Sequence, residues 1–117
     1  MEELVAFLKS RIADANQSVT ALRADSRHDE AALEQIRGNI YGIFVSVAQA
    51  AKARTTTPEE LRAFFEGNLE RIPSSWAVAR EKAEAAGDTV RVVQEDVKLA
   101  AIQEVRDAYA RLCGDAQ

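Results

Sequence analysis

The residues of this chain that could carry chemistry are few and scattered. His28 is the only histidine and Cys113 the only cysteine, so they cannot supply the four ligands of a tetrahedral zinc site. A di-iron bundle would need Glu-x-x-His motifs on inward helix faces, and the chain has none. Two acidic pairs at helical spacing lie off the apolar stripes, as is typical of solvated surfaces: Glu30 with Glu34, and Glu66 with Glu70.

Motifs for nucleophilic or phosphate chemistry are also missing from the sequence. It contains no glycine-rich phosphate loop and no G-x-S-x-G nucleophile elbow. The sequence Gly38-x-x-x-Gly42 lies inside a helical pattern rather than between a strand and a helix, so it does not indicate nucleotide binding. We therefore expect a protein without enzymatic activity, metal or cofactor.

Two amides that interrupt apolar stripes give the one candidate small-molecule site. Asn68 lies in phase with apolar neighbours one turn before Pro73, and Gln94 lies among valines. Because buried amides need hydrogen-bond partners, we expect Asn68 to serve the backbone group that Pro73 frees, or the two amides to pair. The alternative is a ligand pocket at the Pro73 kink, formed by Phe65, Asn68, Trp76 and Gln94.

Composition predicts one all-α domain over residues 1–117. Apolar residues make up 47 % of the chain, and five glycines and two prolines are too few for the turns of an all-β fold. The net charge of −4, with signs interspersed, argues against a nucleic-acid surface. No apolar run approaches the ~18 residues of a membrane span. Together with the absence of a basic leader and of a cysteine pair, this predicts a cytoplasmic protein.

Apolar residues at steps of three and four predict helices over about 2–24, 27–54, 58–86 and 88–112. The third start is the clearest, because Thr57, Pro58 and Glu60 form a capping box with proline at the first helical position. Short connections favour antiparallel neighbours, so we predict an up-and-down four-helix bundle. The alternative is a long helical hairpin that completes its bundle by dimerising.

Pro73 falls inside the third predicted helix, where it removes a backbone hydrogen bond. The apolar stripe nevertheless stays in phase from Leu61 through Trp76 to Ala86. We therefore expect one helix kinked near Pro73, with two abutting helices as the alternative.

Gly38 and Gly42 are unexpected in the most apolar helix, because interior glycine costs about 1 kcal/mol relative to alanine. On a helical projection they lie opposite the stripe that contains Ile36, Ile40 and Ile43, which we expect to face the core. Small residues four apart allow two helices to approach closely, although the glycines could also be merely tolerated. We predict a face for a second copy of the chain or for another protein, made of Gly38, Gly42, Val45, Gln49, Val92 and Leu99.

The expected function follows from these features. It is a non-enzymatic helical interaction protein that dimerises or docks a protein partner through helix faces. The alternative is a bundle that binds a small molecule near the Pro73 kink.

Overall fold

The computed structural model describes residues 1–113, and in them it is all-α, as predicted. Its helices are α1 (Glu2–Ala24), α2 (His28–Arg54), α3 (Pro58–Arg71), α4 (Ser74–Ala85) and α5 (Thr89–Leu112). The predicted ends agree within one residue except around Pro73. The capping box that begins α3 is also confirmed, since the Thr57 side chain accepts from Glu60 N and the Glu60 carboxylate accepts from Thr57 N.

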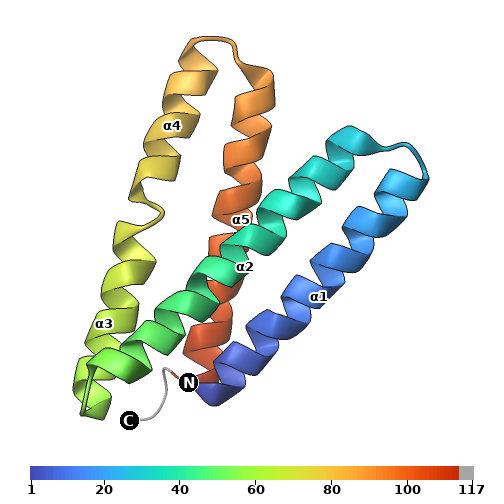
Figure 1. The fold of residues 1–117 in the computed structure, drawn as a ribbon. Coiled ribbons are helices and arrows are strands. Elements are labelled where there is room, and N and C mark those ends of the chain that lie inside the picture. The colour runs from blue at the N-terminus through green and yellow to red at the C-terminus, as the bar shows by residue number, and fades with distance from the viewer. Residues whose placement is uncertain (114–117) are drawn as a thin grey trace.

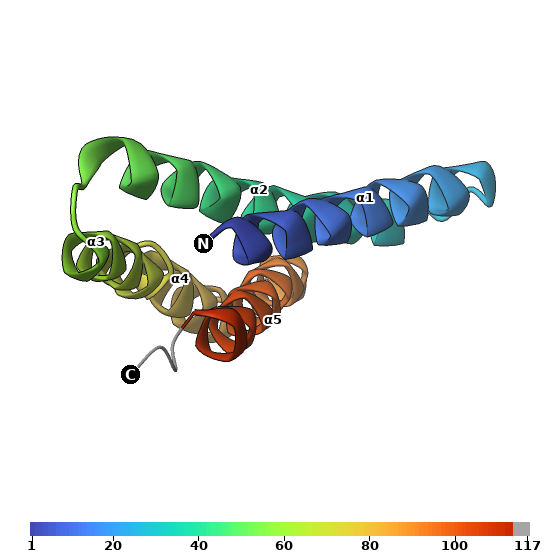
Figure 2. The same ribbon diagram turned by 90° about the horizontal axis from the view of Figure 1, so that it is seen from below.

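The helices form two antiparallel hairpins packed as two layers. One layer holds α1 and α2, and the other holds the α3–α4 rod and α5 (Figure 2). The hairpins pack together at the end where α2 passes into α3, and their turns at residues 25–27 and 86–88 diverge (Figure 1). The radius of gyration is 15.6 Å, against about 13 Å for a compact domain of this length. The bundle is therefore open at one end.

The break at Pro73 is a kink, as predicted. Ile72 and Pro73 both keep right-handed helical dihedrals, with φ/ψ of −63°/−47° and −78°/−5°. Proline has no N–H, so the Leu69 carbonyl loses its helical donor. Arg106 Nη2 of α5 donates to that carbonyl at 3.1 Å, so the freed backbone group is satisfied by α5. The prediction that Asn68 does this is wrong, because Asn68 Nδ2 donates to the Phe64 carbonyl.

The core lies where the two layers meet. Phe65 of α3 stacks on Tyr109 of α5 with ring centroids 4.9 Å apart, and Phe44 of α2 meets Phe65 edge-on at 6.2 Å. These aromatic contacts join α2, α3 and α5 at the closed end, where Leu4 and Leu8 of α1 belong to the same core. The largest fully buried side chains are Tyr41, Phe44, Phe65, Leu4, Leu8, Ile102, Glu95 and Val105.

None of the helices within residues 1–113 combines the length and the hydropathy that a bilayer crossing requires.

Candidate interaction surface

The side of α2 that faces away from α1 carries apolar residues that the rest of the chain leaves partly uncovered. α2 packs against α1, α3 and α5, but α3 and α5 diverge from it over part of its length (Figure 1). Ile43 is 38 % exposed although it lies in the most apolar part of the sequence. We call the partly exposed set on this side the outer stripe: Leu33, Ile36, Ile43, Val47 and Ala50.

A groove between α2 and α3 follows the second half of the outer stripe. It has a volume of about 620 Å³ and an apolar floor that includes Ile43, Val47 and Phe64. Two arginines, Arg54 and Arg71, line it as well. An apolar floor with cationic residues suits an amphipathic partner that carries acidic groups.

A second groove, between α2 and α5, lies at the other end of the stripe. Its volume is about 330 Å³, and Leu33 of α2 faces Val90 and Val93 of α5 across it. Val90 is 68 % exposed and Val93 is 45 % exposed. They belong to the valines around Gln94 that the sequence places on an apolar stripe, and they are uncovered because the two hairpins diverge here (Figure 1).

Charged residues stand at the two ends of the outer stripe. Asp29 lines the α2–α5 groove in the first turn of α2, and Arg54 lines the α2–α3 groove in its last turn. Both side chains are exposed, and neither forms an ion pair with another residue of the described part of the chain. They therefore remain available to a partner.

The face predicted from the glycines lies partly inside the chain. A Cβ on Gly38 would stand 3.1 Å from the Ala15 Cβ of α1, and Val45 is only 9 % exposed. The expectation that both face away from the chain's own core is therefore wrong, because Gly38 permits the close approach of α1 and α2. A Cβ on Gly42 would meet nothing within 4 Å, and Gln49 is exposed.

The two predicted residues of α5, Val92 and Leu99, are half-buried. The structure does not gather them with the α2 residues into the surface that was predicted, since the exposed apolar residues of α5 are Val90 and Val93.

The predicted ligand pocket does not form as a unit. Phe65 is fully buried in the core, Asn68 lines the α2–α3 groove, and Gln94 lines the α2–α5 groove. Trp76 is half-buried, with the Lys98 ammonium 5.9 Å from its ring centroid. The four residues thus occupy separate environments, and small-molecule binding is not the function that we propose.

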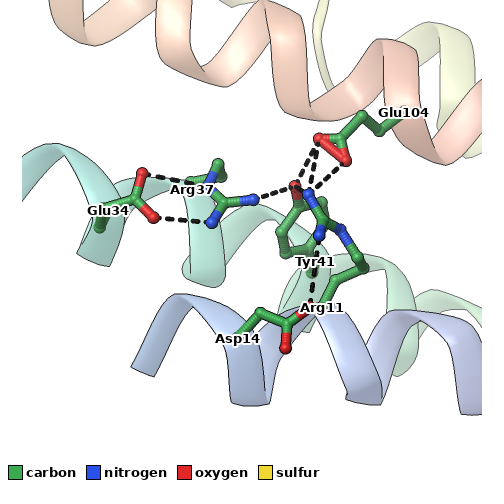
Figure 3. Close-up of polar contacts among 6 residues, drawn as sticks. All are labelled: Arg11, Asp14, Glu34, Arg37, Tyr41 and Glu104. Atoms are coloured by element: carbon green, nitrogen blue, oxygen red, sulfur yellow. Dashed lines mark hydrogen bonds and ion pairs between the residues drawn. The ribbon is translucent and has the colours of Figure 1, made fainter. Parts of the chain in front are cut away.

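A polar cluster centred on Tyr41 connects the two layers (Figure 3). The Tyr41 hydroxyl donates to Glu104 Oε2 of α5 at 2.7 Å and accepts from Arg37 Nη1 at 2.9 Å. Arg11 Nη2 of α1 donates to Glu104 Oε1 at 2.9 Å, and Arg37 also pairs with Glu34. The cluster therefore links α1, α2 and α5 close to the point where the hairpins diverge.

The charges and hydrogen bonds of this cluster indicate that it holds the helices together. Burial raises the pKa of the Tyr41 phenol above its ordinary value, and its hydrogen bond to Glu104 raises this pKa further. The guanidinium groups of Arg11 and Arg37 both stand 5.6 Å from the Tyr41 ring centroid. Because these groups bind mainly one another, we interpret the cluster as what fixes the angle between the hairpins.

Glu95 is the one fully buried charged side chain among those described. Its Oε2 pairs with Arg91 Nε at 2.8 Å and Lys98 Nζ at 3.2 Å, both on α5, while Oε1 has no partner. The sequence shows this as an acid with a base four residues before and three after it. Such spacing is also common on exposed helix surfaces, so it does not predict burial.

The described residues contain no group of three or more His, Cys, Asp and Glu side chains that could hold a metal ion. Comparison of the chain with family models, with curated proteins and with solved structures found no match.

Proposed function

We propose that this chain is a non-enzymatic interaction protein that docks an amphipathic α-helix along the outer stripe of α2. The observation that carries the proposal is the exposure of Ile43 on the floor of the α2–α3 groove. The apolar pattern of α2 includes residues that the neighbouring helices leave uncovered. Exposed apolar surface of this kind is typical of protein-interaction sites.

The shape of the surface supports a helix as the docked element. The grooves lie toward opposite ends of α2, and each is bounded by a second helix, α3 or α5. A helix laid along the stripe would fill the position that another helix takes in a complete bundle. Docking an amphipathic helix into an apolar groove is a common recognition mode.

The test uses a synthetic, fluorescently labelled peptide of three heptads, with leucine at two positions of each heptad and glutamate and lysine elsewhere. Its fluorescence anisotropy is measured against the wild-type chain, Ile43→Glu and Gln49→Glu. Gln49 is the matched control because it is an exposed residue on another side of the same helix. Both substitutions introduce the same side chain, so they differ only in the face that they change.

We expect Ile43→Glu to weaken peptide binding at least about tenfold, because it places a charge at the centre of the contact. Gln49→Glu should leave the affinity unchanged. Self-association that is lost in I43E and kept in Q49E would support the proposal equally. The absence of both peptide binding and self-association would contradict the proposal. Association that I43E leaves unchanged would also contradict it.

A further inference from the structure

The spacing of the residues along the partly exposed side of α2 is the same whether it is counted from the N-terminal or the C-terminal end of the helix. The residues in phase are separated by four, three, four, three, four, three and four positions. This is the heptad spacing of a coiled-coil seam. Among them only Ile40 is buried in the chain's own core, at 3 % exposure. The residues are Asp29, Leu33, Ile36, Ile40, Ile43, Val47, Ala50 and Arg54.

A symmetric pattern of this kind fits a second copy of the same helix that runs in the opposite direction. With the two-fold axis near the middle of α2, Ile36 lies opposite Val47 of the partner subunit, and Ile43 lies beside the axis. Such a pairing uses the same surface on both copies and closes after two. It leaves no uncovered stripe to add a third.

The charges at the two ends of this pattern also favour an antiparallel pairing. Asp29 and Arg54 are the first and last residues of the pattern, and they have opposite signs. An antiparallel pairing places Asp29 of each copy opposite Arg54 of the partner subunit, which makes two ion pairs. A parallel pairing would place like charges opposite each other at both ends. The ion pairs cannot form within one chain, since a helix separates these residues by about 37 Å.

We propose that the helix docked on the outer stripe is α2 of a second copy of this chain, antiparallel, with Asp29 and Arg54 setting the direction. This inference rests on the proposed function and names its partner. The two copies then pack their α2 helices as a seam, and each fills part of the other's two grooves.

Charge reversal tests this arrangement directly. Asp29→Arg and Arg54→Asp are prepared as separate full-length chains, and their association is measured by sedimentation, alone and mixed. Each variant alone puts like charges opposite each other, so its dimer dissociation constant should rise about twofold to thirtyfold. The mixture should restore wild-type affinity, because the heterodimer has opposite charges at both ends. Glu3→Arg is the control, as an exposed reversal in the first turn of α1.

Cysteine cross-linking gives a second measurement that does not depend on charge. In a Cys113→Ser background, a tagged Ile36→Cys chain is mixed with an untagged Val47→Cys chain and oxidised. The antiparallel pairing predicts a disulfide between the two different chains. A parallel pairing predicts a disulfide between two copies of the Ile36→Cys chain instead.

The outcomes separate the two levels of the proposal. Rescue in the mixture, with cross-linking between the two different chains, supports the antiparallel dimer. A dimer that is lost in Ile43→Glu but unaffected by either charge reversal would overturn the antiparallel arrangement. It would still support the outer stripe as a docking surface. A wild-type chain that stays monomeric while it binds the synthetic peptide would overturn the second copy as partner. A chain that does neither would overturn the proposed function itself.

Discussion

Arg106 and Pro73 are energetically coupled in a way that the structure allows us to estimate. Pro73 leaves the Leu69 carbonyl without its helical donor, and Arg106 Nη2 donates to it at 3.1 Å. Arg106→Met keeps the apolar stem of the side chain and removes the donor. Leu69 is only 7 % exposed, so we expect a loss of about 1.5 kcal/mol in the free energy of unfolding.

The second substitution in this cycle is Pro73→Ala, which supplies a backbone N–H that can donate to the Leu69 carbonyl. In the wild type that N–H competes with Arg106, whereas in the Arg106→Met background it replaces the missing donor. Pro73→Ala should therefore be more favourable in the second background by about 1 kcal/mol. Urea denaturation of the four proteins measures the coupling. Lys9→Met is the control, since it removes an exposed cation that bonds to no other described side chain.

Strict additivity of the two substitutions, or an Arg106→Met variant as stable as the Lys9→Met control, would refute this account of the kink. It would mean that solvent, rather than α5, satisfies the freed carbonyl.

Three further predictions concern the core of the fold. Tyr41→Phe should lower the free energy of unfolding by about 1–2 kcal/mol, measured by denaturation, because Glu104 loses a donor. Gly42→Ala should raise the melting temperature through helix propensity worth up to about 1 kcal/mol, whereas Gly38→Ala should gain less or destabilise, because its Cβ would stand 3.1 Å from Ala15; equal effects would contradict this packing. Burial raises the pKa values of Tyr41 and Tyr109. Their contribution to the free energy of unfolding should therefore be fully present below the unfolded pKa of about 10 and be lost as the pH rises further. Tyrosinate absorbance and denaturation against pH together measure this, and phenols that titrate as in the unfolded chain would refute it.

Local signals in the sequence were enough to predict the helices. The capping box at Thr57 and the apolar phase through Pro73 depend only on residues within a few turns of each other, and the structure confirms both. The partner of the Leu69 carbonyl could not be predicted in this way. Arg106 lies on a different helix, and its approach depends on the tertiary packing of α3 against α5.

The outward face of α2 was predicted wrongly for a related reason. A helical projection assumes one inward direction, but α2 has neighbours on several sides, so Gly38 and Val45 pack within the chain. The projection also treated Ile43 as a core residue, whereas it is 38 % exposed. The Tyr41 cluster was missed because no short spacing relates Arg11, Tyr41 and Glu104. Only the crossing of three helices brings these side chains together.

The central claim is that the outer stripe of α2 is a binding surface for another helix. Its most direct test is sedimentation equilibrium of the wild type, Ile43→Glu and Gln49→Glu over a range of protein concentrations. We expect the wild type and Gln49→Glu to pass from monomer to dimer together, and Ile43→Glu to remain monomeric. A dimer that persists unchanged in Ile43→Glu would contradict the claim.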